Sequence, residues 1–154
     1  MSEAELSVAE QLVVEPLTFE WLTSDQLLVG ACVHLVKDSI KHGYHGKNHK
    51  NTFKYYCFLI SLSKGEILKY APFEGGWIHA IDLAEDQTTA LIAGANQTEL
   101  WNTGLNNFGS VKTLVKHSSG IDFLAISPIS PVIVYQTHRG DTSIFALDLQ
   151  VGNP

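Results

Sequence analysis

The segment from residue 110 to residue 149 limits the fold most strongly, because it holds four short apolar runs in succession. Turn-forming residues stop each run, and the runs occupy 111–116, 121–127, 132–137 and 143–149. Short apolar runs bounded by turns predict β-strands, and four strands in about forty residues is the size of one propeller blade. This segment therefore predicts an all-β fold.

The same pattern can be followed back to residue 17. The earlier predicted strands occupy 17–22, 26–36, 55–62, 67–71, 77–83, 88–93 and 99–101. Run 111–116 is expected to complete the blade that begins at residue 77, as its outer strand. No stretch between these runs shows the 3.6-residue periodicity of an amphipathic helix.

The spacing of the first strands indicates a repeat. They begin at Leu17, Trp77 and Ile121, at intervals of 60 and 44 residues. Removing the polar sixteen-residue segment 37–52 from the first interval leaves 44. Equal periods with four strands and no helix favour a propeller over a sandwich or barrel. We predict about three blades of a WD-repeat-like β-propeller, as an incomplete ring.

The chain is expected to divide into an N-terminal segment 1–16, blades over 17–149 with a polar insertion at 37–52, and a tail 150–154. Within the first segment, 11–14 could be a short strand ended by Pro16, and a helix over 3–12 competes with it. No outer strand follows 143–149. A strand 11–14 from another copy, or from the other end of a ring, could supply it.

Ring closure sets a further limit, because propellers contain about four to eight blades. A chain of about three blades would expose the apolar faces of its first and last blades. The sequence therefore predicts a fragment of a longer protein, an assembly of several copies, or a ring completed by other protein subunits.

Composition narrows the class of protein. The 154 residues are 45% hydrophobic with a net charge of −6, which favours a globular fold and disfavours a generally basic nucleic-acid binder. Cys32 and Cys57 are expected to be reduced thiols in or near a core. The N-terminus lacks the pattern of a signal peptide, and no apolar run could span a bilayer. We expect an intracellular protein with no membrane partner, no cofactor and no small-molecule substrate.

Several short motifs resemble those of the WD-repeat β-propeller family. They are His117 to Ile121, Ile126 to Pro128, Gly140 with Asp141, Leu147 to Leu149 in place of the Trp-Asp pair, Leu100 to Asn102, and Gly65 with Tyr70 at a turn and a third strand. The similarity covers roughly residues 17–149. It departs from the family in having no intact Trp-Asp pair and the histidine in only one repeat. The resemblance implies a non-catalytic scaffold that binds other proteins.

Within that family, the polar insertion followed by an apolar strand resembles the early blades of degenerate WD-repeat subunits of the small-subunit processome. That resemblance implies a role in ribosome biogenesis and rRNA processing, with a nuclear or nucleolar location. Without it, a cytoplasmic location is expected.

The insertion and the strand start after it concentrate basic and aromatic residues. A lysine-rich segment with interleaved rings can contact RNA phosphates and stack on bases. The candidate RNA-binding residues are Lys37, Lys41, Tyr44, Lys47, Lys50 and Lys54, with Tyr55 and Tyr56 beside them. A lysine-rich surface loop that only confers solubility is the alternative.

The sequence gives little support for metal binding or catalysis. His42, His45 and His49 have a spacing that suits a metal on a helix, but Gly43 and Gly46 disfavour a helix, so we expect no metal. Hydrolase and nucleotide-binding motifs are absent from the sequence. The remaining enzyme hypothesis places an active site at the mouth of a propeller's central channel, where several carboxylates or histidines would have to converge. Two clusters hold catalytic residue types, one of Asp82, Glu85 and Asp86 and one of His117, Ser118, Ser119 and Asp122. An acidic turn and a polar loop explain them better, so we expect no catalytic residues.

Two further expectations concern large side chains in predicted strands. His34 is expected to be a hydrogen-bonded core or edge histidine rather than a catalytic one. Trp21, Trp77 and Trp101 are expected to fill the space between blades.

Overall fold

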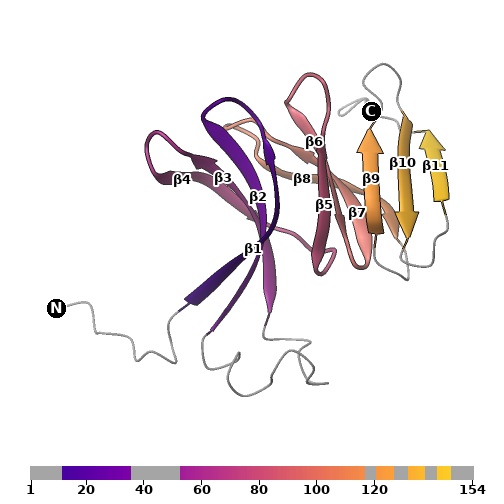
Figure 1. The fold of residues 1–154 in the computed structure, drawn as a ribbon, viewed down its shortest axis with the longest axis horizontal. Helices are drawn as coiled ribbons and strands as arrows, with labels where there is room; N and C mark the ends of the chain where they lie inside the picture. The colour runs from indigo at the N-terminus through magenta and orange to yellow at the C-terminus, as the bar shows by residue number, and fades with distance from the viewer. Residues whose placement is uncertain (1–11, 36–52, 117–120, 127–131, 138–141, 147–154) are drawn as a thin grey trace.

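A computed structural model of the chain describes residues 12–35, 53–116, 121–126, 132–137 and 142–146. These residues form strands joined by turns, in three antiparallel sheets (Figure 1). Within the described ranges, no helix is long and apolar enough to cross a membrane.

The first sheet, blade 1, has the order β1-β2-β3-β4. Each strand pairs with the next in sequence, so the sheet is a simple meander. The strands are β1 (Leu12–Trp21), β2 (Gln26–Leu35), β3 (Lys54–Ser61) and β4 (Glu66–Pro72). The third and fourth strands turn at Gly65, whose φ of 62° favours glycine.

The second sheet, blade 2, repeats this order as β5-β6-β7-β8. Its strands are β5 (Ile78–Leu83), β6 (Thr89–Gly94), β7 (Gln97–Asn102) and β8 (Gly109–Lys116). The run predicted at 111–116 is the outer strand of this blade, as expected.

The third sheet, blade 3, has the order β11-β10-β9. It contains β9 (Ile121–Ile126), β10 (Val132–Thr137) and β11 (Thr142–Ala146). In the described part of the chain, β11 ends this sheet, where blades 1 and 2 have a fourth strand.

The three first strands lie next to one another, since β1 contacts β5 and β5 contacts β9. Later strands of each sheet lie progressively farther from these contacts, so the sheets fan out like blades around their first strands (Figure 1). The all-β prediction of about three blades in an incomplete ring is confirmed.

Two apolar clusters join the blades. The first lies between blades 1 and 2 and contains Leu28, Cys57, Ile92 and the fully buried Trp101. The second joins blade 2 to blade 3 through Leu91, Ala93, Leu100 and Leu124. Alternate residues of β6 therefore point to opposite neighbours, which is why this strand is apolar from Ala90 to Ala93.

Polar and close contacts hold the junctions in register. The Asp82 carboxylate on β5 accepts a 2.6 Å hydrogen bond from the backbone N–H of Ile126 on β9. At the other junction, a Cβ added to Gly30 would lie 2.8 Å from Cγ2 of Ile78, so only glycine allows this approach.

Three expectations need correction. The break predicted at Pro16 is wrong, because β1 runs through it from Leu12 and pairs with β2 on both sides. Pro16 is tolerated since β1 is an edge strand and a bulge follows it. Residues 12–14 are therefore part of blade 1 rather than a separate strand or helix end. Gly65 lies between the third and fourth strands and Tyr70 in the fourth, so their predicted equivalence is also wrong.

The division of the chain into domains stays a prediction. Most of the segment 1–16, the insertion 37–52 and the tail 150–154 lie outside the described residues.

Candidate protein-interaction surface

One face of blade 1 carries large apolar side chains that remain exposed, and we call it the open face. Strand alternation and the pairing register place its members on one side of the sheet. The exposed members are Leu12, Val14, Phe19, Trp21, Ile67 and Tyr70. Their exposed fractions range from 51% for Trp21 to 68% for Leu12 and Tyr70.

A bulge keeps the apolar residues of β1 together on this face. Val14 and Phe19 are five positions apart, so strict alternation would place them on opposite sides of the sheet. The pairing register shifts between Pro16 and Thr18, and this shift restores the match between the two halves of the strand. Without the bulge, half of the apolar side chains of β1 would turn toward blade 2.

An aromatic cluster forms the outer part of the open face. The ring of Phe58 lies 6.1 Å from that of Tyr56 and 6.2 Å from that of Tyr70, and the two tyrosine rings are 6.3 Å apart. These separations are within the range of favourable aromatic contacts. The cluster orders its side chains in advance, which lowers the entropy cost of covering them.

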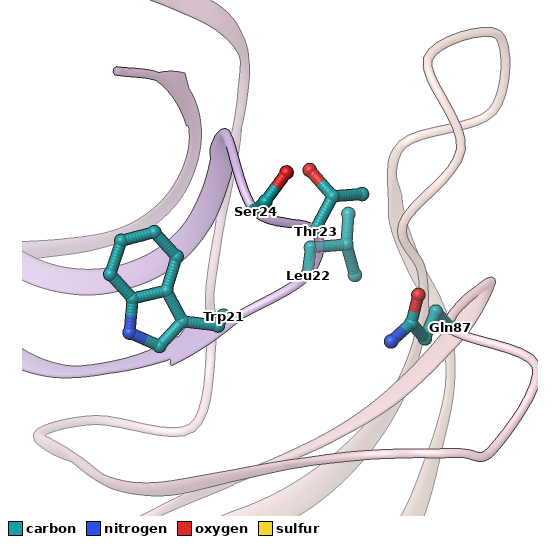
Figure 2. Close-up of a pocket in the computed structure, with 5 residues that line it drawn as sticks. All are labelled: Trp21, Leu22, Thr23, Ser24 and Gln87. Carbon is teal, nitrogen blue, oxygen red and sulfur yellow. The ribbon is translucent and has the colours of Figure 1, made fainter. Parts of the chain in front are cut away.

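A shallow depression lies between the first turns of blades 1 and 2. It has a volume of about 480 Å³ and is lined by Trp21, Leu22, Thr23, Ser24 and Gln87. Figure 2 shows Gln87 across from Leu22 and Thr23, with the Trp21 ring directed away from Gln87. No ionisable side chain lines it. Its polar lining consists of the uncharged side chains of Thr23, Ser24 and Gln87, so it offers no side chain that could act as a general acid or base.

Hydrogen bonds make the turns of blade 1 rigid. The Asp25 carboxylate accepts bonds from Ser63 N–H at 2.6 Å and Ser61 Oγ at 2.8 Å, which ties the β1–β2 turn to the β3–β4 turn. These bonds, the one from Ser63 N–H first, lower the pKa of Asp25. The end of the open face near Trp21 is thus fixed in place.

His34 behaves as the sequence predicted. It is buried, its Nδ1 lies 3.1 Å from the carbonyl oxygen of Leu35, and its Nε2 lies 3.5 Å from Oε1 of Glu15. The ring also packs edge-on against Phe53, at 4.9 Å. The Glu15 and His34 side chains lie on the side of blade 1 that faces blade 2, where these contacts hold the ring in place.

The two cysteines are free and buried, as expected. Burial, with a smaller effect of Glu15, raises the pKa of Cys32 to about 11. Burial also raises the pKa of Cys57. Thiols with raised pKa values are poor nucleophiles, so neither is a candidate reactive site.

The candidate RNA-binding residues are largely untested. Lys37, Lys41, Tyr44, Lys47 and Lys50 lie outside the described residues, as do His42, His45 and His49. Lys54 is described and exposed at the start of β3, where it shares the open face with Tyr56. Among the described residues, no group of three or more His, Cys, Asp or Glu could hold a metal ion.

Two carboxylates of the acidic cluster considered for catalysis, Asp82 and Asp86, accept hydrogen bonds that stabilise the fold. Asp82 bonds to blade 3, and Asp86 Oδ1 accepts a 2.9 Å bond from Thr88 N–H within its turn. Residues 117–119 of the second cluster lie outside the described residues.

One buried carboxylate, Glu99, was not predicted from the sequence. Glu99 is 2% exposed and accepts hydrogen bonds from Trp101 Nε1 at 3.1 Å, Gln97 Nε2 at 2.9 Å and Glu74 N–H at 3.2 Å. It fixes the Trp101 ring and the link between blades 1 and 2. A Glu two residues before a Trp in a strand shares its face, and this spacing was the available signal.

The three tryptophans differ in how far they are covered. Trp101 is fully buried and fills the space between blades as predicted. Trp77 packs edge-on against Tyr55 at 6.4 Å but remains 37% exposed. For Trp21 the prediction is wrong, because its side chain lies on the open face, where the described residues leave half of it exposed.

No protein-family model matches this chain, and no relative was found among curated proteins. Solved structures that resemble it include the computationally designed Ika4 protein, at 12% identity, covering 90% of this chain and 93% of that one with a TM-score of 0.49. The C-terminal WD40 domain of Sif2 is 14% identical, and the match covers 84% of this chain and 56% of that one with a TM-score of 0.48. KlHsv2 with its loop 6CD replaced by a Gly-Ser linker is 9% identical, and the match covers 91% of this chain and 51% of that one with a TM-score of 0.46.

The chain spans about half the length of the latter two proteins. Similarities this weak carry no functional inference. The assignment of blades rests on the strand order and packing of the chain's own sheets.

Proposed function

We propose that this chain is a non-catalytic protein-interaction scaffold, a partial propeller that binds other protein subunits. The open face of blade 1 carries the proposal. It holds six exposed large apolar residues on one ordered sheet. Contiguous apolar surface of this kind marks interaction sites, whereas single exposed apolar residues are ordinary.

The chemistry of the face favours a lasting contact over a transient one. Apart from Lys54 at the start of β3, its large exposed members are apolar or aromatic, and the faces of obligate complexes likewise resemble a protein core cut in half. A β-sheet with an uncovered apolar face is also prone to aggregate, so a partner would protect the folded chain. Aromatic residues such as Trp21 and Tyr70 are the types that dominate interface energies.

The described carboxylates support the non-catalytic part of the proposal. Asp82, Asp86 and Glu99 each accept hydrogen bonds that hold turns or blades together. A catalytic carboxylate needs access to substrate, and Glu99 is enclosed by its donors.

The partners would be proteins of ribosome assembly in the nucleolus. The support is the sequence resemblance of the insertion 37–52 and the strand after it to processome subunits. Purification of the tagged chain from its natural cells should then recover ribosome-assembly proteins and pre-ribosomal RNA. Fluorescence microscopy should place the chain in the nucleolus. Recovery of unrelated proteins from another compartment would contradict this assignment.

A crosslinking experiment tests the scaffold proposal directly. A photoreactive amino acid at Phe19, on the open face, should form a specific adduct with another polypeptide in cells. The matched control is Leu105, which is 48% exposed in the β7–β8 loop, away from that face. Equal, nonspecific labelling from both positions would contradict the proposal.

RNA binding is a second candidate function, favoured by one observation. Lys54 is exposed on the same side of β3 as Tyr56, so a cation and an aromatic ring lie on one surface directly after the insertion. Deleting residues 37–52 should leave the fold intact, remove salt-sensitive RNA binding and leave protein binding at the open face. Unchanged RNA affinity after the deletion would exclude this role for the insertion.

A further inference from the structure

We infer that the depression between the first turns of blades 1 and 2 is a docking site for an arginine side chain from a basic segment of another protein. This inference goes beyond the proposed function, because it concerns one end of the two blades rather than the open face of blade 1. Both turns that form the depression, β1–β2 and β5–β6, lie inside the described residues.

Hydrogen bonds fix both walls of the depression. On the blade 1 side, Thr23 Oγ1 accepts bonds from Asp25 N–H at 3.1 Å and Gln26 N–H at 3.0 Å, which hold the β1–β2 turn. On the blade 2 side, Gln87 has a φ of 57°, a conformation that is uncommon for residues other than glycine. Thr103 Oγ1 donates a 2.7 Å bond to the carbonyl oxygen of Gln87 and holds it there. Walls fixed in advance lower the entropy cost of binding.

The side chains that line the depression offer hydrogen-bond acceptors and an aromatic ring, but no charge. Gln87 contributes a carboxamide oxygen, and Ser24 contributes a hydroxyl oxygen from the opposite turn (Figure 2). Trp21 forms the border away from Gln87, and half of its side chain is exposed. A guanidinium group donates up to five hydrogen bonds, stacks on aromatic faces and is more weakly hydrated than an ammonium group. The lining therefore suits arginine better than lysine.

Negative charge surrounds this uncharged lining. Glu85 and Asp86 are exposed in the β5–β6 turn, and Asp25 lies in the β1–β2 turn. The strand pairs that carry the two turns, residues 12–35 and 78–94, contain no Lys or Arg. Because complementary charge guides protein association, the partner segment should be basic.

Two further carboxylates at the ends of the first strands repel each other. Burial and, to a smaller extent, the negative charge of Asp82 on β5 raise the pKa of Glu20 on β1. Among the described residues of the turns at this end of the blades, the only cation is Lys64, and it interacts with Asp25. An incoming cation would lower the repulsion between Glu20 and Asp82, which favours its binding.

The arginine has to come from outside the described sheets. Arg139 is the only arginine in the sequence, and it follows β10. The last residue of β10, Thr137, pairs with Ile121 at the start of β9. The other end of β9, at Ile126, is the one that contacts Asp82 next to the depression. The strands thus run toward Arg139 at the end of the sheet away from the site, and a segment of another protein is the source that we infer.

Fluorescence polarisation with a labelled Gly-Arg repeat peptide tests the site on the purified chain. The peptide should bind more weakly as salt rises, and more tightly than a Gly-Lys repeat of equal charge. Glu85→Lys reverses a charge beside the depression and should weaken the affinity about fivefold. Glu74→Lys is the matched control, since it makes the same change in net charge at an exposed position in the β4–β5 connection, at the opposite end of the blades. It should change the affinity far less.

Two more variants locate the arginine. Gln87→Gly removes the carboxamide, tolerates the positive φ and should weaken the affinity severalfold. A photoreactive amino acid at Ser24 should form an adduct in cells with an arginine-containing segment of a different protein. Circular dichroism checks that each variant is folded. If Glu85→Lys does not fold, Glu85→Gln replaces it, with Glu74→Gln as its control.

Four outcomes would contradict the inference. Equal losses in Glu85→Lys and Glu74→Lys would indicate attraction to the acidic chain as a whole. Equal affinity for the Gly-Lys repeat would exclude recognition of a guanidinium group. Unchanged affinity in Gln87→Gly would place the peptide elsewhere, and a Ser24 adduct within the same polypeptide would exclude another protein as the source. The Phe19 crosslink tests the open face separately, so the scaffold proposal can stand when this one fails.

Discussion

The two faces of blade 1 are built from the same strands and differ in what covers them. On one face, Leu28 and Cys57 are fully buried against Trp101 of blade 2. On the other, Phe19 and Trp21 are more than half exposed, although they are equally apolar. A sheet buries an apolar face only by packing it on another layer, and among the described residues only one face of blade 1 has such a layer.

The largest expected effect compares one tryptophan from each side of this contrast. Trp101→Ala removes a fully buried ring between blades and should cost about 4 kcal/mol of unfolding free energy. Trp21→Ala, on the open face, should cost less than about 1 kcal/mol in dilute solution. Urea denaturation measures both. Similar losses in the two variants at low protein concentration would contradict the distinction between the faces.

The second largest expected effect comes from Glu99, whose hydrogen bonds form a polar network at the junction of blades 1 and 2. Glu99→Ala leaves three hydrogen-bond donors without their acceptor in a buried site and should cost about 3 kcal/mol. Glu99→Gln keeps a carbonyl oxygen and should cost about 1 kcal/mol. Glu66→Ala, at an exposed position of β4, is the control and should change little. Equal stability of Glu99→Ala and Glu66→Ala would refute the role of the network.

Gly30 tests how closely the covered face is packed. Gly30→Ala should cost about 2 kcal/mol, because the new Cβ would lie 2.8 Å from the buried Ile78 side chain. Gly65→Asn is the control, since nothing lies within 4 Å of a Cβ there and Asn tolerates its positive φ. Thermal unfolding would show the difference. A neutral Gly30→Ala would mean that the blades separate easily at this junction.

The smallest expected effect is on thermal stability and comes from the charge of Glu20, on the face of blade 1 that packs against blade 2. Partial burial, with a smaller repulsion from Asp82, raises the pKa of Glu20. A raised carboxyl pKa favours folding when the group is protonated, and this contribution is lost as pH rises through the folded-state pKa. Glu20→Gln should therefore slightly raise Tm at pH 7 and not at pH 3. A larger benefit at pH 3 than at pH 7 would contradict the sign of the shift.

The sequence predicted strands well because each one is a short apolar run between turn residues. The period of 44 residues located the first strands of blades 2 and 3 within a residue, at Ile78 and Ile121. The predicted strand boundary at Pro16 was wrong, because the effect of a proline depends on whether its strand lies at the edge of the sheet, and the sequence does not show which strands are edges. The start of β1 was therefore placed five residues late.

The surface was harder to predict than the fold. Phe19 and Phe58 have the same apolar pattern as covered residues, so the sequence could not separate a face that packs within the chain from one that does not. Trp21 was expected between blades for this reason, and the bulge that aligns it with Val14 leaves no clear sequence signal. The candidate residues of the insertion remain a prediction from composition alone.

Oxidative footprinting in intact cells, compared with the dilute purified chain, tests most directly whether the open face is an interface. Trp101 should be protected in both samples, whereas Phe19, Trp21 and Tyr70 should react in the dilute chain and be protected in cells. Leu105 should react equally in both. If the three residues of the open face react as strongly in cells as in the dilute chain, that face is not covered and the central claim fails.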